Sequence, residues 1–383
     1  MEEPMQYVGL NMGEIRRKNR ASILTYINEN GPSSRKEMAE ATKLTPSAIS
    51  QMTRTMITDG LLDEVGRVLE EGVGRKQVLV DINYDYRLIV AINIEPDWTT
   101  IALANLRGDA RKHVTISTRK DHPQSFMKEI AKHCRQMIQD ETISVVGASV
   151  GITGIVDVES GTSIHAYGIW DQEVEVCKLL EAELAIPVTI ENNVKSFALA
   201  ELLYGYGRQY NNLMVLKWGP GVGSTLIVNK EIYGGRHGKA GEIGHMIVEK
   251  NGRLCTCGRH GCLETKVSYQ AMQEICSFAP EDFSKVYTEA VESHSADKFN
   301  EKIDILAQTL VNSMTIISPN RVVLCGSMFR SQLIRQRLIE AVKEYDSSYD
   351  EAKIFYTDLA DREDYIGPVA NFVHYGLAYG DIL

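Results

Sequence analysis

One histidine and three cysteines lie close together in the chain and constrain its fold more than any other feature. The cysteines Cys255, Cys257 and Cys262 fall within eight residues, and His245 precedes the first by ten positions. One imidazole and three thiolates form the ligand set of a closed structural zinc site. Two intervening glycines favour the tight turns that such a site needs. The alternative is a set of packing cysteines beside a core histidine, but the spacing favours zinc.

The rest of the composition is that of an ordinary globular protein. The chain has 383 residues, of which 44% are hydrophobic and 24% are charged. This length is too great for one core, so two or three domains are expected. The other four cysteines are scattered singly, which suits reduced thiols better than disulfides. We find neither a signal-peptide pattern nor an apolar run long enough to span a bilayer, and therefore expect a cytoplasmic protein without membrane contact.

The formal net charge of −10 is unevenly distributed. Residues 1–80 contain eleven basic and eleven acidic side chains, so the remainder of the chain carries the whole deficit. A strongly acidic body does not itself attract DNA. Any contact with nucleic acid is therefore expected from local basic faces in the first 80 residues.

Residues 1–81 predict a winged helix-turn-helix domain. The apolar spacing indicates a helix over 13–30, and the capping box Ser34-Arg-Lys-Glu37 begins a second helix that ends near Thr42. Thr45 and Pro46 suit the N-cap and first position of a third helix. Strand-like segments at 61–65 and 77–81 surround a glycine-rich hairpin and complete the wing.

The third helix is the expected recognition helix and would enter the major groove of DNA. Gln51 can contact adenine through two hydrogen bonds, whereas serine and arginine neighbours suit phosphates. An arginine at the tip of the wing suits the minor groove. The predicted DNA contacts are Arg35, Ser47, Ser50, Gln51, Arg54, Gly74 and Arg75. The alternative is that this small helical unit only docks partner proteins.

Beyond residue 81 the pattern is α/β. Strand-like segments alternate with helical stretches, and no repeat of 20–50 residues is present, which excludes a solenoid. The polar Glu191-Asn-Asn193 follows the strand 188–190, at the kind of strand end where α/β folds bind ligands. The predicted strands are 88–94, 99–106, 145–152, 188–190, 213–218, 224–228 and 321–324.

The run Gly-Gly-Arg-His-Gly-Lys-Ala-Gly-Glu-Ile-Gly-His over 234–245, followed by 255–264, closely resembles the signature of the ROK family (repressors, open reading frames and sugar kinases). The resemblance covers nearly the whole chain, and the first domain resembles that of the repressor branch. It implies a winged helix-turn-helix domain followed by a two-lobed actin-like (ribonuclease H-like) sugar-kinase fold. The implied first lobe is 82–196, joined by the C-terminal helix 368–383, and the second lobe is 197–367. Matching segments lie at 92–94, 101–103, 151–157, 187–193 and 219–223.

Two positions depart from the kinases of this family. Asn193 stands where the resemblance places the aspartate that removes a proton from the sugar hydroxyl. An amide cannot accept that proton, so a general-base contribution of roughly 10² to 10⁴ in rate is lost. Glu95-Pro96 occupies the first phosphate loop, where a carboxylate repels phosphate and proline lacks an N–H donor. We therefore expect no catalytic residue and no ATP binding.

The sugar-contacting positions of the family are retained. Carboxylates and amides suit sugar hydroxyls because they can orient several hydrogen bonds at once. His245 would serve as a zinc ligand through one nitrogen and face the sugar with the other. Surface charge alone is the alternative for the two glutamates. The predicted sugar-binding residues are Gly154, Asn192, Asn193, Glu242, His245 and Glu264.

Together these features predict a transcriptional repressor that binds operator DNA and senses a sugar or sugar phosphate. Two-fold operators match two-fold proteins, so a homodimer or a dimer of dimers is expected. The first alternative is an active ATP-dependent sugar kinase with an accessory domain. The second is a regulator that has lost its ligand and responds to a partner protein, such as a component of a phosphotransferase system.

Overall fold

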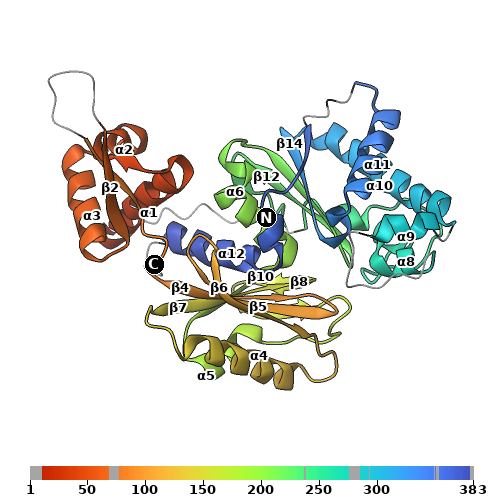
Figure 1. Cartoon of the computed structure of the whole chain (residues 1–383), viewed down its shortest axis with the longest axis horizontal. Coiled ribbons are helices and arrows are strands. Elements are labelled where there is room, and N and C mark those ends of the chain that lie inside the picture. Colours follow the sequence, from red (N-terminus) through yellow and green to blue (C-terminus); the bar gives the residue numbers. More distant parts are fainter. Residues whose placement is uncertain are drawn as a thin grey trace, which may run out of the picture.

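The computed structural model describes residues 11–68, 77–236, 239–275, 285–292, 294–348, 350 and 353–379. Figure 1 shows a small helical head followed by two α/β lobes, with the chain returning at its end to the first lobe. In the described residues no helix combines the length and the apolar character needed to cross a membrane.

The head is a winged helix-turn-helix domain, as predicted. Its elements are α1 (Met12–Asn30), β1 (Ser33–Ser34), α2 (Arg35–Thr42), α3 (Pro46–Thr58), β2 (Leu62–Val68) and β3 (Gln77–Ile82). Ser34 and Glu37 form the predicted capping box of α2, and the Thr45 hydroxyl accepts a hydrogen bond from the Ala48 amide at the start of α3. The tip of the wing, residues 69–76, lies outside the described residues.

The three helices of the head enclose a small apolar core. Their apolar stripes converge because residues three and four positions apart lie on one face of a helix. The fully buried side chains of this core include Ile23, Leu24, Ile27, Met38 and Ile49. Met52 and Met56 extend it along α3, which leaves the opposite face of α3 toward solvent.

The first lobe is a five-stranded sheet with the order β10-β7-β4-β5-β6. Its strands are β4 (Leu88–Ile94), β5 (Trp98–Asn105), β6 (Ala110–Ser117), β7 (Val145–Ile152) and β10 (Val188–Asn192). Strands β4, β7 and β10 are parallel, whereas β4, β5 and β6 form an antiparallel meander. The helices α4 (Pro123–Ile138) and α5 (Val176–Leu184) cover one face, and α12 (Glu363–Tyr379) lies on the other (Figure 1). A hairpin of β8 (Ile155–Asp157) and β9 (Thr162–His165) lies beside β10.

The second lobe repeats this topology with the order β13-β12-β11-β14-β15. Its strands are β11 (Leu213–Trp218), β12 (Val222–Val228), β13 (Glu231–Ile232), β14 (Arg321–Cys325) and β15 (Ile354–Tyr356). Here too an antiparallel meander is followed by two parallel strands. Its helices are α7 (Glu264–Val267), α8 (Tyr269–Gln273), α9 (Val286–Glu292), α10 (Ala296–Ile317) and α11 (Gln332–Tyr345). Two sheets of the same topology in one chain are the ribonuclease H-like architecture expected from the sequence.

Two buried helices join the lobes. The helix α6 (Asn193–Tyr204) contacts α12 and β10 on one side and β11 and β12 on the other. The expected lobe boundary at 196/197 falls inside α6, a helix that is buried along most of its length and packs against both lobes. The helix α12 begins at Glu363, five residues before the expected start. Pro368 lies inside this helix.

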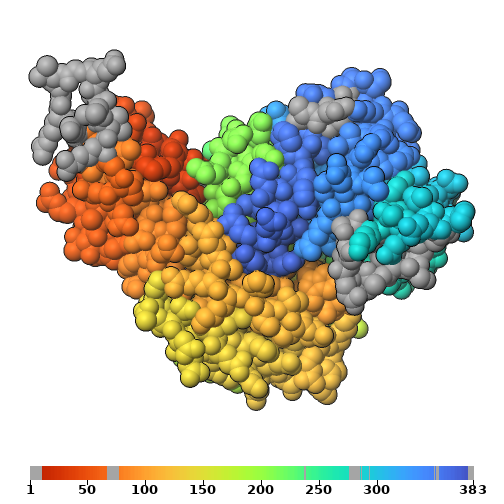
Figure 2. Space-filling view, in the orientation of Figure 1, coloured from red at the N-terminus to blue at the C-terminus, as the bar shows by residue number. Residues whose placement is uncertain are grey.

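The head packs against the body through α1 and α12, and it also makes polar contacts near the end of α6. Asn28 of α1 donates a hydrogen bond to the carbonyl of Leu203 at 3.2 Å, and its own side-chain oxygen accepts one from the Tyr84 hydroxyl at 3.3 Å. Lys230, between β12 and β13, forms an ion pair with Glu29 at 3.1 Å. Figure 2 shows the head, in red, meeting the green segment near residue 200. The position of the head is therefore fixed by contacts with both lobes.

Candidate functional site

The histidine and the three cysteines of the sequence motif form one cluster. The ligand atoms of His245, Cys255, Cys257 and Cys262 all lie within 4.8 Å of one another. The Cys255 sulfur is 3.6 Å from Nδ1 of His245, and the sulfurs of Cys257 and Cys262 are also 3.6 Å apart. Zn–S bonds of about 2.3 Å in a tetrahedron place neighbouring ligand atoms about 3.7 Å apart. The donor set and its spacing therefore fit a metal ion.

The turns of this segment explain how three thiols reach one point. His245 ends the short 3₁₀ helix Ile243–His245, and a bridge between Ile247 and Cys262 brings the two ends of the motif together. Gly261 has φ = +75°, and a Cβ atom there would lie 1.8 Å from the Glu249 carbonyl oxygen. Only glycine fits such a close backbone approach.

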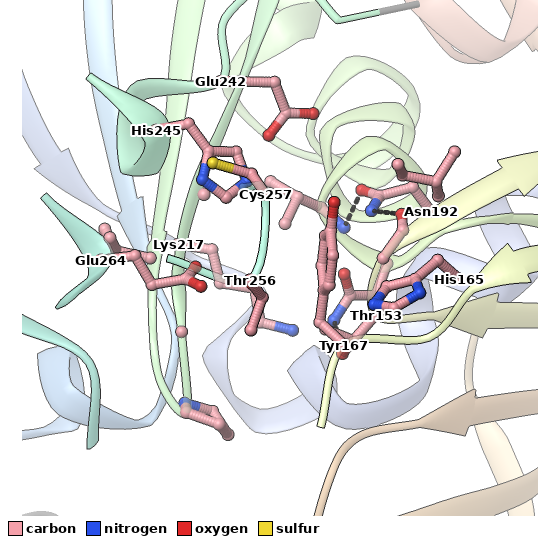
Figure 3. Close-up of a pocket in the computed structure, with 18 of the residues that line it drawn as sticks. Thr153, His165, Tyr167, Asn192, Lys217, Glu242, His245, Thr256, Cys257 and Glu264 are labelled. Carbon is pink, nitrogen blue, oxygen red and sulfur yellow. Dashed lines mark hydrogen bonds between the residues drawn. The ribbon is translucent and has the colours of Figure 1, made fainter. Parts of the chain in front are cut away.

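A cavity of about 760 Å³ opens between the two lobes beside the cluster of His245 and the three cysteines. Its volume lies in the range of small-molecule sites. All six residues predicted to bind sugar line it, and they come from both lobes: Gly154, Asn192, Asn193, Glu242, His245 and Glu264. Figure 3 shows Glu242, His245 and Glu264 on one side of this cavity and Asn192 on the opposite side. The structure thus brings together residues that are up to 110 positions apart in the sequence.

Asn192 holds the start of α6 in place at the edge of the cavity. Its side-chain oxygen accepts hydrogen bonds from the amides of Val194 and Lys195 at 2.9 and 3.1 Å. Its Nδ2 donates to the Gly154 carbonyl at 2.8 Å. Gly154 has φ = +110°, and a Cβ atom there would lie 2.0 Å from the His165 carbonyl oxygen. Asn192 therefore serves as a helix N-cap, and one N–H of its amide remains to reach a ligand.

Asn193 belongs to a hydrogen-bonded network in the wall of the cavity. Its Nδ2 donates to Oε1 of Glu95 at 2.9 Å and to the Thr153 hydroxyl oxygen at 3.1 Å. The Thr153 hydroxyl in turn donates to Oε2 of Glu95 at 3.1 Å. Lys217 of the second lobe lies 2.5 Å from Oε1 of Glu95, and only 6% of the Glu95 side chain is exposed. The two lobes are therefore joined across the cavity by a buried ion pair.

The electrostatics of this network favour its charged form. Burial alone would raise the pKa of Glu95, but the charge of Lys217 and the hydrogen bonds from Lys217, Asn193 and Thr153 hold it below its ordinary value. Burial acts in the opposite direction on Lys217, yet the nearby carboxylates of Glu95 and Glu363 raise its pKa. The sequence had suggested a role for Glu95 alone. Nothing in its local pattern indicated Lys217, because that residue lies inside a buried strand.

The carboxyl groups on the second-lobe side are partly shielded from water. Burial raises the pKa of Glu242, although the cationic side chains of Lys195, Lys239 and Arg259 oppose the shift. Burial, with a contribution from Glu242, also raises the pKa of Glu264 to about 7. Carboxyl groups in such surroundings can accept hydrogen bonds from several hydroxyls.

Tyr167 is a residue of this site that the motifs did not reveal. Its ring lies edge-on to His165 with 4.7 Å between ring centroids, and edge-on to His245 with 6.0 Å. Figure 3 shows the Tyr167 ring standing in the cavity between the residues of the two lobes. An aromatic ring in this position can pack against the apolar C–H face of a sugar. Its place in an irregular loop gives no local signal of this role.

The predicted DNA contacts on α3 form an accessible face. Ser47, Gln51 and Arg54 are exposed and Ser50 is half-buried, whereas the opposite side of the helix packs in the core of the head. Arg35 is positioned differently. Its Nε donates to the Thr53 hydroxyl at 3.0 Å, and its guanidinium pairs with Glu64 at 3.0 Å. Gly74 and Arg75 lie outside the described residues.

The comparison with protein families identifies both parts of the chain. Residues 89–371 match the ROK family model, and residues 16–63 match a winged helix-turn-helix DNA-binding model. Because the ROK model covers most of the chain, the protein belongs to the ROK family.

Individual proteins agree with this assignment. The xylose repressor of Caldicellulosiruptor bescii is 25% identical, with 93% of this chain and 95% of that protein covered. The crystal structure of a ROK family transcriptional regulator, a homologue of the E. coli MLC protein, has a TM-score of 0.78 at 20% identity, covering 96% of this chain and 99% of that one. A ROK family glucokinase from Streptomyces griseus, in complex with glucose and AMPPNP, has a TM-score of 0.63 at 20% identity, covering 74% of this chain and 98% of that one. The glucokinase therefore shares the fold of the body, and the regulator shares that of nearly the whole chain.

Proposed function

We propose that this protein is a sugar-responsive transcriptional repressor. The observation that carries the proposal is a cavity lined, from both lobes, by side chains of the kinds that bind sugar hydroxyls. The same chain also has a helix-turn-helix head. A relative named as a xylose repressor, which aligns over nearly the whole chain, supports the same function. Such a protein would act beside DNA in the cytoplasm, and its recognition face would be Ser47, Ser50, Gln51 and Arg54 of α3.

In this proposal the body binds sugar without phosphorylating it. Asn193 has no proton-accepting carboxylate, and both hydrogens of its amide nitrogen are already donated to Glu95 and Thr153. Glu95 is the acidic group of this network, and the charge of Lys217 helps to hold its pKa below the ordinary value, which makes it a weaker base. A carboxylate that is already satisfied by three partners is a poor general base. The same carboxylate disfavours the phosphates of ATP.

The metal in this proposal is a structural Zn²⁺ ion bound by His245, Cys255, Cys257 and Cys262. Four protein ligands fill a tetrahedral site, so no position remains for a reactive water. His245 is three residues from Glu242, and Cys262 is two residues from Glu264. The ion would therefore hold the sugar-binding carboxyl groups in place through the backbone.

The helix α6 offers a direct connection between the sugar cavity and the head. Its first turn is capped by Asn192 at the cavity, and the carbonyl of Leu203 near its other end accepts the hydrogen bond from Asn28. A twelve-residue helix spans about 18 Å, and it moves as one body because its backbone is hydrogen-bonded throughout. A sugar that shifts the start of α6 would also shift Leu203, the residue that Asn28 of the head contacts. Differential sugar affinity for the two positions would then change DNA affinity.

The proposed repressor would bind its operator as a homodimer or a dimer of dimers, with one head in each half-site. DNA selected from a random pool by the full-length protein identifies the operator. Sugars and sugar phosphates are then screened, by fluorescence anisotropy, for those that release the labelled operator. The proposal requires one selected sequence and at least one compound that changes its affinity. A pool that yields no enriched sequence contradicts it.

A further inference from the structure

We propose that the buried ion pair between Glu95 and Lys217 makes this cavity selective for uncharged sugars over phosphorylated ones. The inference rests on the proposed sugar-binding function and names the class of its effector. Both side chains line the cavity, one from each lobe. Their exposed fractions are only 6% for Glu95 and 13% for Lys217.

Lys217 is the buried lysine of the described cavity wall. A phosphate group needs cationic or N–H donors that are free to turn toward it. Lys217 is committed to Glu95 at 2.5 Å, and the carboxylate of Glu363 also contributes to its charged state. Asn193 and Thr153 direct their donors to the same Glu95 carboxylate. This wall therefore presents no uncommitted positive charge among its described residues.

Two further carboxyl groups and two exposed cations also line the cavity. The other carboxyl groups that line the cavity are Glu242 and Glu264, on the side of the second lobe. The additional lining cations, Lys239 and Arg259, are exposed, and both lie near Glu242. A phosphate placed against the inner wall would face the buried Glu95 carboxylate, and like charges repel strongly where the surrounding protein lowers the effective dielectric constant. Sugar hydroxyls carry no such charge and can donate hydrogen bonds to these carboxylates.

The ion pair thus performs two tasks at one place. It joins the two lobes at the cavity. It also neutralises the charge of Lys217, which would otherwise attract an anion. Replacing Glu95 by glutamine keeps the size of the side chain but removes the charge that neutralises Lys217. We therefore expect the variant to gain affinity for anions, with Glu363 as the one remaining carboxylate that partly compensates Lys217.

The test uses the full-length protein in isothermal titration calorimetry and thermal denaturation. The probes are xylose, glucose and N-acetylglucosamine, the 6-phosphates of the two hexoses, and inorganic phosphate. For the wild type we expect each hexose that binds to do so about 10- to 100-fold more tightly than its 6-phosphate, the effect of one uncompensated charge. A 6-phosphate that binds the wild type as tightly as its parent sugar overturns the inference.

The variants test the role of the ion pair even if no sugar of the panel binds. In Glu95→Gln, and more strongly in Glu95→Gln with Glu363→Gln, we expect affinity for inorganic phosphate to rise about tenfold or more. Glu95→Gln with Lys217→Met has neither charge and should show no gain. Glu175→Gln removes a carboxylate from the exposed pair with Lys178 and serves as the surface control. Folded variants that gain no anion affinity overturn the inference, and if none of them folds, the wild-type titrations decide it.

Operator binding is measured in parallel, so that two kinds of failure can be distinguished. Release of the operator from the wild type by a sugar phosphate at concentrations as low as those of its parent sugar would overturn the selectivity and leave the repressor function standing. Absence of any specific operator would remove the repressor function, whatever the cavity binds.

Discussion

The contact between Asn28 and the end of α6 provides a sharp test of how the sugar cavity communicates with the head. Asn28 is only 4% exposed and makes two hydrogen bonds, one to the Leu203 carbonyl and one from the Tyr84 hydroxyl. Asn28→Ala removes both. At about 1 kcal/mol for each buried hydrogen bond, the docked position of the head loses about 2 kcal/mol.

This magnitude sets the expected effect on regulation. A change of 2 kcal/mol corresponds to about a 30-fold change in an equilibrium constant. The quantity of interest is the ratio of operator affinities measured without and with sugar. In Asn28→Ala we expect this ratio to move closer to one, by up to about 30-fold. Sugar binding itself should persist, because Asn28 lies outside the lining of the cavity.

The assay is fluorescence anisotropy of labelled operator, titrated with protein in the absence and presence of saturating sugar. Asn30→Ala is the matched control, since Asn30 lies on the same helix, is exposed, and bonds only locally to the Tyr26 carbonyl in the described structure. If folded Asn28→Ala retains the full wild-type response to sugar, coupling through this contact is refuted.

Three further perturbations test separate parts of the structure. Cys257→Ser should release zinc and weaken sugar binding together, as measured by metal analysis and calorimetry; full sugar affinity in a zinc-free variant would contradict the proposed scaffold. Ile49→Ala, in the core of the head, should cost about 2–5 kcal/mol and abolish operator binding while sugar binding survives. Burial raises the pKa of Glu201 to about 7, against 4.5 for an exposed carboxyl group. The folded protein therefore binds this proton more tightly than the unfolded chain does, and the free energy of unfolding falls as pH rises from about 5 to 8. Glu201→Gln should remove about 3 kcal/mol of that loss in denaturant titrations, and an unchanged pH profile would exclude this origin.

The sequence was most informative where local chemistry determines local structure. The capping box at Ser34 and the cap and proline at Thr45-Pro46 placed two helix starts correctly, because their hydrogen bonds involve neighbouring residues. The strands 88–94 and 213–218 were predicted with their observed bounds, since each consists of apolar residues apart from a single polar one, Asn93 or Lys217. By contrast β6, which alternates half-buried and exposed side chains at the edge of its sheet, was missed.

In the candidate site, too, some residues could be predicted from the sequence and others could not. Family motifs identified the six sugar-type residues that line the cavity, but not the partners that only the fold brings to them. Lys217 and Glu95 are 122 positions apart and meet because equivalent strands of the two lobes face one cleft. Tyr167 reaches the cavity from an irregular loop after β9. Such contacts depend on tertiary packing and leave no periodic trace in the sequence.

The most direct test of the proposed function is the affinity of the protein for its sugar when free and when bound to operator DNA. Calorimetric titration of both forms gives two dissociation constants, and their ratio is the coupling between the cavity and the head. A sugar-responsive repressor requires a ratio well away from one, about 5- to 150-fold for typical coupling energies. Equal dissociation constants for the two forms would show that the sugar does not control DNA binding.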